Sequence, residues 1–187
     1  KDDVYRRDFT INTLLKNLCS GEVLDITGSA LSDLKNGIIR TPVEPERTFY
    51  DDPLRMLRAV RFAARFGFAI EENTRRAIIE NSSRLSLIST AAPVVSAERI
   101  RDEFIKIMSD KSYVSGIEML STLGLLGQFI PELETLRGVT QNNWHTLDVW
   151  DHTILALRNI DPSATTATRL GMLFHDIGKP ATRTIDD

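Results

Sequence analysis

The pattern of hydrophobic and polar positions changes near residue 51. Before that point, short apolar runs at 23–26 and 38–41 alternate with glycine and proline turns, as is typical of short strands and short helices. Beyond it, apolar residues recur at intervals of three and four, which predicts helices. These helices are expected over residues 53–65, 72–84, 96–109, 111–122, 147–159 and 164–177. The predicted fold class is therefore mainly α, with a small α/β part at the N-terminus.

Capping and breaking residues set the expected ends of these elements. Asp52 followed by Pro53 predicts a helix start, and Gly67 predicts the end of the same helix. Ser96 and Asp161 are the expected N-caps of two later helices. The other expected features are helices over 7–17 and 28–36, a stop at Gly37, a linker marked by Pro42 and Pro45, and a final stop at Gly178 and Pro180.

The helix expected from residue 53 has two chemically distinct faces. At about 100° per residue, its apolar side chains share one face and four arginines share the opposite one. Leu54 and Phe62 intrude on the arginine face. The apolar face consists of Met56, Leu57, Ala59, Val60, Ala63 and Ala64, and the arginine face of Arg55, Arg58, Arg61 and Arg65.

Asp51 and Asp52 lie just before this helix, within reach of Arg55. A carboxylate accepts from an exocyclic amino group, while a guanidinium donates to a ring nitrogen or carbonyl, so such a pair imitates the edge of a pairing base. The alternative is a solvated charged face with i,i+3 ion pairs. The stripe contains no lysine, which keeps the nucleobase hypothesis open.

A second polar cluster occupies the N-terminus. Arg6 or Arg7 could meet a triphosphate, and Asp8 and Asn12, four residues apart on an expected helix, could hold a ribose hydroxyl. The alternative is a capped helix start with surface ion pairs.

A third cluster lies near the C-terminus, where His175 and Asp176 end an apolar helix and His152 precedes them by 23 residues. Imidazole and carboxylate suit a divalent metal, and facing helices can build such a site. A histidine in an apolar run is also commonly a satisfied core residue, and a metal here would need at least one further ligand.

Composition narrows the class of protein. The 187 residues are 42% hydrophobic and 26% charged, with no run near the roughly 18 apolar residues of a membrane span. The single cysteine, Cys19, excludes a disulfide framework and a cysteine-rich zinc site, and it favours the cytoplasm. A net charge of −3 argues against a protein that coats nucleic acid non-specifically. Nine of the ten basic residues in 51–110 are arginine, however, so a local arginine site is compatible with this charge.

Four motifs, in order, resemble those of the class II bacterial tRNA nucleotidyltransferases (CCA-adding enzymes) and their poly(A) polymerase relatives. Residues 6–12 (RRDFTIN) resemble the nucleotide-contacting motif, and residues 25–40 resemble the segment that joins head to neck. Residues 51–65 resemble the nucleotide-selecting helix, and residues 97–103 the neck motif. His152 with His175-Asp176 resembles the start of the HD phosphohydrolase domain that some members append.

This resemblance implies a reaction and a role for each site residue. A nucleotide from CTP or ATP would be transferred to the 3′ hydroxyl of a tRNA, with two Mg²⁺ ions assisting. Arg7 and Asp8 would contact the triphosphate and ribose, with Asn12 nearby. The remaining implied roles are a template for the base at Asp52 and Arg55, support of that pocket by Arg58, and bracing of the neck helices by Glu98 and Arg99.

The sequence departs from the family pattern in two ways. Asp51 stands where the family usually has glutamate, so its carboxylate reaches one methylene less far towards the base. The metal-binding carboxylates of the family's head precede the first matched motif, and the last aspartate of the HD set would follow Asp187. We therefore expect a piece of a longer enzyme that does not catalyse nucleotide transfer alone.

The expected domains are the end of a nucleotidyltransferase head at 1–44, a helical neck and body at 45–138, and the start of an HD domain at 139–187. CCA addition is the favoured function. Addition of CC or A alone, or poly(A) synthesis, uses the same motifs. An HD phosphohydrolase with an RNA-binding helical region and a non-catalytic RNA-binding module are the alternatives from other classes. The sequence does not define the oligomeric state.

Overall fold

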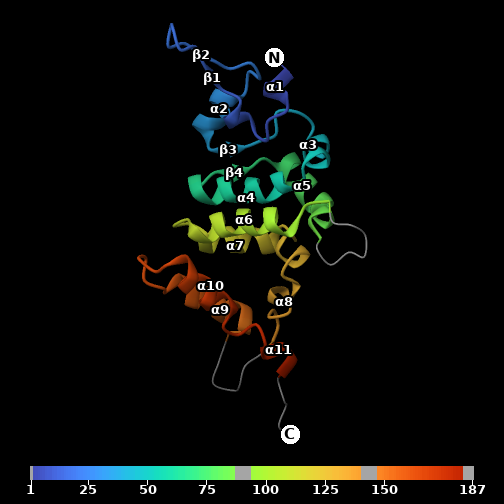
Figure 1. The fold of residues 1–187 in the computed structure, drawn as a ribbon, viewed down its shortest axis with the longest axis vertical. Helices are drawn as coiled ribbons and strands as arrows, with labels where there is room; N and C mark the ends of the chain where they lie inside the picture. The colour runs from blue at the N-terminus through green and yellow to red at the C-terminus, as the bar shows by residue number, and fades with distance from the viewer. Residues whose placement is uncertain (1, 87–93, 140–146, 183–187) are drawn as a thin grey trace.

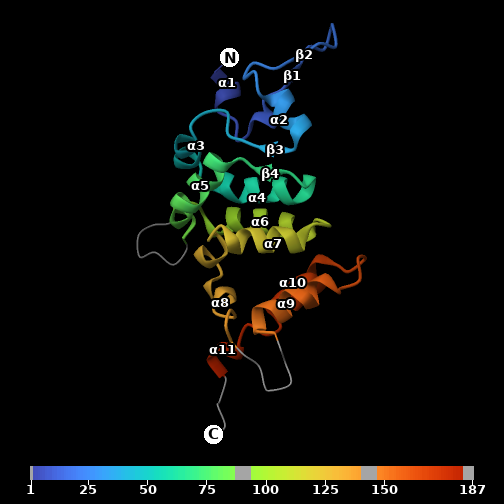
Figure 2. The ribbon, with the colours of Figure 1, turned by 180° about the vertical axis from the view of Figure 1, so that it is seen from behind.

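The computed structural model describes residues 2–86, 94–139 and 147–182. Figures 1 and 2 show the elements following one another along the long axis, with the N-terminal segment at one end and the last helices towards the other. Helices α4, α6 and α7 form the layers between them. The described residues are mainly helical with few strands, which confirms the predicted fold class.

The N-terminal segment mixes short helices with short strands. Gly37 ends its longest helix in the left-handed conformation, with φ of 66°, as predicted. The expected strands near 23–26 and 38–41 are each two residues long. The elements are α1 (Asp2–Tyr5), η1 (a 3₁₀ helix, Thr10–Asn12), β1 (Leu15–Lys16), β2 (Val23–Leu24), α2 (Ala30–Asn36) and β3 (Ile38–Ile39).

The helix predicted over 7–17 is wrong. Phe9 is extended, with φ of −135° and ψ of 152°, and only the three residues of η1 are helical. The Thr10 amide donates to the Arg40 carbonyl oxygen at 2.8 Å, and Leu15 pairs with Leu24 in an antiparallel ladder. Hydrogen bonds to backbone far along the chain therefore pair the N–H and C=O groups that a helix would pair locally.

The linker predicted around Pro42 and Pro45 is confirmed only for residues 42–44, which lie in no helix or strand, because Pro45 already begins α3 (Pro45–Asp51). Pro45 occupies the first turn, where its missing N–H costs nothing, and Phe49 on the same helix is fully buried. A proline that indicated a break in the chain is in fact a helix start.

Helix α4 (Leu54–Phe66) buries all six residues of the predicted apolar face. The helix begins one residue later than predicted, with Pro53 instead of Asp52 at its N-cap position, although Asp52 Oδ1 still accepts from the Leu54 amide at 3.2 Å. Gly67, with φ of 66°, ends it as predicted. The following strand β4 (Ala69–Ile70) pairs in parallel with β3 and was not predicted, because two residues carry no periodic signal.

Helices α6 and α7 both pack against α4 and complete the central core. Gly116 of α7 lies so close to α6 that a Cβ atom there would be 2.5 Å from Ile107 Cγ2. Ser96 caps α6 as predicted, accepting from the Arg99 amide. The elements of this part are α5 (Glu72–Asn81), η2 (Ser82–Leu85), α6 (Ala97–Ser109), α7 (Tyr113–Thr122), η3 (Leu126–Gln128) and α8 (Pro131–Glu134).

The C-terminal part contains α9 (Val149–Arg158), α10 (Thr166–Phe174) and α11 (Lys179–Thr182). Thr165 caps α10, not Asp161, which instead accepts from the Ser163 amide in a turn. The predicted final stop is wrong, because α10 ends at Phe174 and Pro180 lies within α11. Among the described helices, none combines the length and hydropathy needed to cross a bilayer.

A buried arginine joins this part to the central core. Arg169 of α10 is 6% exposed and donates to the carbonyl oxygens of Met108, at 3.0 Å, and Asp110, at 2.9 Å. Its guanidinium also lies 4.4 Å from the ring centroid of Tyr113. A side chain of α10 therefore caps carbonyl oxygens at the C-terminal end of α6.

Candidate functional site

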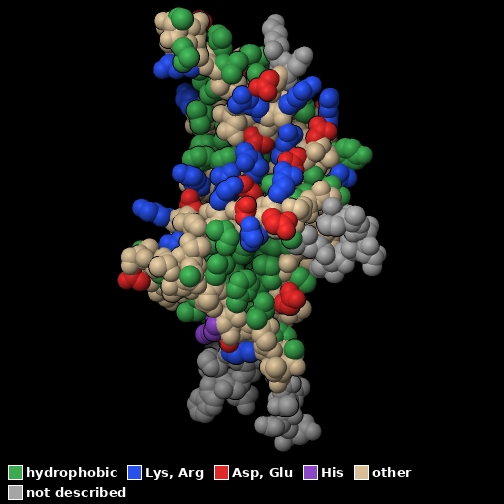
Figure 3. Space-filling model, in the orientation of Figure 1, with side chains coloured by type: hydrophobic (Ala, Val, Ile, Leu, Met, Phe, Trp, Pro, Cys, Tyr) green, Lys and Arg blue, Asp and Glu red, His purple; other side chains and the backbone are tan. Residues whose placement is uncertain are grey.

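A cavity of about 570 Å³ lies where the N-terminal segment meets α4 and α6. In Figure 3, lysine and arginine side chains gather over the half of the molecule that holds these elements. The cavity brings together most residues that the sequence singled out at both the N-terminal cluster and the arginine helix. Its lining residues are Asp3, Arg6, Arg7, Asp8, Asn12, Asp52, Leu54, Arg55, Arg58, Phe62 and Arg99.

Asp8 is the most buried carboxylate of the cavity, at 7% exposure. Its Oδ1 accepts from the Phe9 amide and from Asn12 Nδ2, both at 2.9 Å. Its Oδ2 accepts from Arg58 Nε at 2.8 Å. Asp8 and Asn12 are therefore adjacent as predicted, although a turn and η1 bring them together instead of a regular helix.

Arg7 lies beside this pair. It donates through Nη1 to the Asn12 carbonyl oxygen and through Nη2 to Asp3 Oδ2, both at 3.1 Å. The ion pair with Asp3 is exposed on both sides, so it contributes little stability. Such a guanidinium remains available to an anionic ligand.

Asp52 and Arg55 both line the cavity, but their side chains do not bond to each other. Asp52 Oδ2 accepts from Arg99 Nη2 at 2.9 Å. Arg55 donates to the carbonyl oxygens of Arg6, at 2.6 Å, and Thr48, at 3.3 Å. Asp51 is exposed at the end of α3 and does not line the cavity.

One further arginine of the stripe, Arg61, is largely buried, whereas Arg65 is 56% exposed. Arg61 is 13% exposed and donates through Nε to Glu103 Oε2 at 2.8 Å. Lys106 donates to the other Glu103 oxygen at 2.7 Å. Burial disfavours the charged Glu103 carboxylate, but these two cations outweigh that effect and hold its pKa below the ordinary value. The largely buried Arg61–Glu103 ion pair therefore links α4 to α6.

Glu98 lies in the first turn of α6, outside the cavity lining. Its own backbone amide and the Ser96 hydroxyl lower the pKa of its carboxyl. The sequence grouped Glu98 with Arg99 as one bracing motif, whereas the structure separates them. Arg99 reaches the cavity and Glu98 remains at the helix start. The sequence held one signal for this separation: neighbouring residues on a helix point their side chains in different directions.

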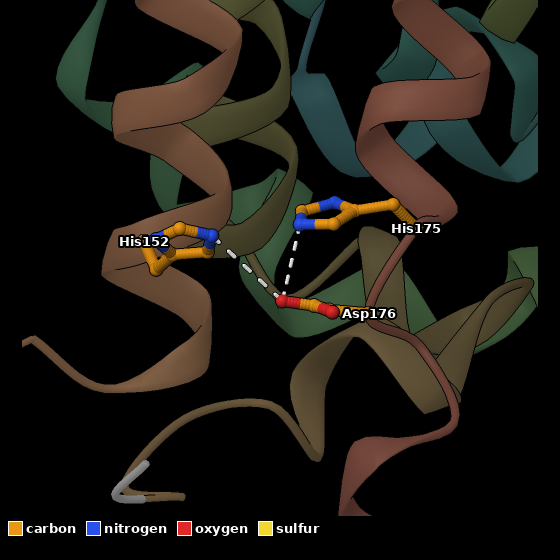
Figure 4. Close-up of side chains that lie close together, drawn as sticks. All are labelled: His152, His175 and Asp176. Atoms are coloured by element: carbon orange, nitrogen blue, oxygen red, sulfur yellow. Dashed lines mark ion pairs between the residues drawn. The ribbon is translucent and has the colours of Figure 1, made fainter. Parts of the chain in front are cut away.

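The third cluster lies at the far end of the molecule. Figure 4 shows His152 on one helix facing His175 and Asp176, which follow another. His152 belongs to α9, and the other two come directly after α10. Asp176 Oδ2 lies 3.1 Å from His175 Nε2 and 3.8 Å from His152 Nε2. One candidate ligand atom from each residue falls within 4.8 Å of the others.

The tautomer of His175 suits a metal ligand. His175 Nδ1 lies 2.7 Å from the Met172 carbonyl oxygen, which only accepts, so Nδ1 carries the hydrogen. In the neutral ring, Nε2 then presents a lone pair towards the Asp176 carboxylate. Two lone pairs at this distance repel unless a cation lies between them or the ring is protonated. Lys179 Nζ, 2.7 Å from Asp176 Oδ2, supplies one nearby positive charge.

Comparison with known proteins places these features in one class. Residues 1–40 match the family described as "Poly A polymerase head domain". Residues 67–136 match the family described as "Probable RNA and SrmB- binding site of polymerase A". The chain therefore matches two family models of polymerase A, in the order head and then binding site.

Individual relatives narrow this class. The chain is 36% identical over 189 residues to the CC-adding tRNA nucleotidyltransferase of Thermus thermophilus, covering 100% of this chain and 42% of that protein. It is 35% identical over 185 residues to the A-adding tRNA nucleotidyltransferase of Deinococcus radiodurans, covering 97% of this chain and 41% of that protein. A solved complex of a CCA-adding enzyme with ATP superposes with a TM-score of 0.66 and 26% identity, over 100% of this chain and 41% of that chain.

The chain belongs to the bacterial tRNA nucleotidyltransferase family, as its motifs indicated. It spans about two fifths of the length of these curated relatives.

Proposed function

We propose that this chain forms the nucleotide-selecting part of an enzyme that adds nucleotides from CTP and ATP to the 3′ end of tRNA. The observation that carries the proposal is the cavity in which Asp8, Asn12, Asp52 and Arg55 meet. A segment separated from α4 by some 40 residues is there tied to it through the Arg58–Asp8 pair. Two relatives with 36% and 35% identity to this chain are named for CC addition and A addition to tRNA.

The cavity offers a distinct group to each part of a nucleoside triphosphate. Arg6 and Arg7 supply positive charge for the triphosphate. The Asp8 carboxylate accepts four hydrogen bonds, from the Phe9 amide, Asn12 and Arg58, so it would bind a ribose hydroxyl in exchange for one of these donors. Asp52 accepts from the amino group of cytosine or adenine while Arg55 donates to the ring, and the carbonyl oxygen of uracil or guanine repels the carboxylate.

The reaction is attack of the tRNA 3′ hydroxyl on the α-phosphate, with pyrophosphate leaving. Magnesium, when bound, would stabilise the charge on the entering and leaving oxygens. The carboxylates that line this cavity do not fit two such ions, because Asp3, Asp8 and Asp52 each face an arginine. We therefore expect the magnesium ligands outside these 187 residues, and transfer activity in the 187-residue chain alone would contradict this.

The choice between CCA, CC, A and poly(A) addition needs a substrate test with the full-length protein and magnesium. The substrate is a tRNA that ends at its discriminator base, supplied with CTP, ATP or both. Two added residues with CTP alone and three with both nucleotides establish CCA addition. Two added residues with CTP alone and again two with both nucleotides establish CC addition. A long tail with ATP alone identifies a poly(A) polymerase. No extension of this tRNA, or of one ending in CC, contradicts the proposal.

We further propose the domain division 1–44, 45–138 and 139–187 and a cytoplasmic location. The division is supported by the start of α3 at Pro45 and by the position of the candidate metal ligands, all of which lie beyond residue 139. The free, exposed Cys19 supports a reducing compartment.

A second candidate function is a metal-dependent phosphohydrolase site at His152, His175 and Asp176. The convergence of one candidate ligand atom from each residue within 4.8 Å of the others favours it. A divalent ion held there would activate a water for attack on a phosphate ester. The three residues on two helical segments are a partial ligand set, as the sequence indicated.

Metal binding tests this second function directly on the 187-residue chain. In calorimetric titration with Mn²⁺ or Ni²⁺, His152→Ala and Asp176→Asn are each expected to weaken binding at least about tenfold, because each removes one of few ligands. Asp151→Asn, an exposed neighbour outside the cluster, is the matched control and is expected to bind as the parent does. Equal affinity in all four proteins would exclude this metal site.

A further inference from the structure

The carboxylate of Asp52 is held by two fixed donors. Its Oδ1 accepts from the Leu54 amide at 3.2 Å, and its Oδ2 accepts from Arg99 Nη2 at 2.9 Å. The first donor belongs to the start of α4 and the second to α6, 47 residues further along the chain. Together they fix the rotation of the carboxylate plane.

This arrangement leaves the carboxylate able to bind a ligand. A carboxylate oxygen has two lone pairs, so Oδ2 can accept a second hydrogen bond while Arg99 stays in place. The Asp52 side chain is 29% exposed and lines the cavity. An amino group of a base could therefore reach it from the open side.

Arg99 approaches from a rigid support. It occupies the first turn of α6, where its backbone amide donates to the Ser96 hydroxyl, and the next residue, Ile100, is 2% exposed. The packing of α6 against α4 fixes the distance between the two side chains. The contact is therefore set by the crossing of two helices.

The cavity also contains a competitor for Asp52. Arg55 lies three residues after it, in the first turn of α4, and lines the same cavity. In the structure Arg55 is instead engaged with the carbonyl oxygens of Arg6 and Thr48. Without Arg99, the Asp52 carboxylate could turn towards Arg55. The two proposed base contacts would then form an ion pair with each other instead of binding the base.

We propose that Arg99 is a positioning residue for base selection: it holds Asp52 so that the carboxylate accepts from the amino group of cytosine or adenine. This inference rests on the proposed nucleotidyltransferase function. An ordinary surface ion pair is the competing explanation, since the Arg99 side chain is 51% exposed. The two differ in effect, because a surface ion pair does not change which base is selected.

The test compares Arg99→Ala, Arg99→Lys and Arg101→Ala in the full-length enzyme. Arg101 is the matched control, since it lies on the same helix, is 66% exposed, pairs with adjacent Asp102 and does not line the cavity. The readout is the ratio of kcat/KM for CTP to that for UTP, on a tRNA that ends at its discriminator base. Arg99→Ala is expected to lower this ratio about tenfold, the value of one charge-assisted hydrogen bond. Arg99→Lys should restore part of it, and Arg101→Ala should match the parent.

Three results would overturn the proposal. They are an unchanged ratio in Arg99→Ala, an equal fall in kcat/KM for all four nucleotides, and the same change in Arg101→Ala. Thermal unfolding of each variant separates loss of selection from loss of fold. Failure of the proposed function would differ, because the parent enzyme itself would then fail to extend tRNA or fail to prefer CTP over UTP.

Discussion

Replacing Arg58 with alanine is expected to cost the 187-residue chain about 3 kcal/mol of unfolding free energy, because it leaves a buried carboxylate without its cation. The Asp8 side chain is 8% exposed, and Arg58 supplies both of the donors to its Oδ2. Such a loss corresponds to a fall of roughly 10 °C in Tm for a chain of this size. Urea denaturation and thermal unfolding would measure it.

Arg65→Ala is the matched control on the same face of α4. Its side chain is 56% exposed and lies 3.7 Å from Asp110, so we expect a change within about 1 kcal/mol. Asp8→Asn in the Arg58→Ala background should recover part of the loss, because the uncompensated charge is removed. A loss from Arg58→Ala no larger than that from Arg65→Ala would show that the buried pair does not hold the N-terminal segment on α4.

Arg55→Ala in the full-length enzyme is expected to relax base selection by roughly 10- to 100-fold, the discrimination that a well-placed pair of base contacts supplies. The ratio of kcat/KM for CTP to that for UTP, and for ATP to GTP, would report it. The KM for each nucleotide should change less than these ratios, because Arg6 and Arg7, the proposed triphosphate contacts, line the cavity separately.

Arg7→Ala provides the opposite comparison. It should raise KM for all four nucleotides by similar factors and leave the selection ratios unchanged, since the triphosphate is common to them. If Arg55→Ala instead raised KM uniformly while UTP and GTP were still rejected, Arg55 would be a triphosphate ligand and the template assignment would be wrong.

Local signals predicted those parts of the fold that local physics controls. The six buried residues of α4, the glycine ends at Gly37 and Gly67, and the Ser96 cap all follow from residues within one or two turns of each other. The helix predicted over 7–17 failed because its backbone pairs with residues at 24 and 40. Helix α3 was missed because a proline marks a helix start as readily as a break.

The membership of the candidate site was predicted better than its contacts. Motif positions identified Asp8, Asp52, Arg55 and Arg58, and all four line one cavity. The spacing suggested that Asp52 pairs with Arg55, whereas its partner is Arg99, 47 residues away. Sequence spacing reports neighbours on one helix, but a contact between two helices depends on how they cross.

The side chain of Arg169 has a consequence for how this chain unfolds. From α10, it donates hydrogen bonds to carbonyl oxygens at the C-terminal end of α6. The Tyr113 hydroxyl likewise donates to the Leu157 carbonyl oxygen of α9 at 2.6 Å. Removing the residues beyond 138 would expose both a helix end and a ring that these bonds now cover. We therefore expect the C-terminal helices and the central layers to unfold together although they belong to different proposed domains, so the backbone amides of α6, α9 and α10 should show similar protection from hydrogen exchange.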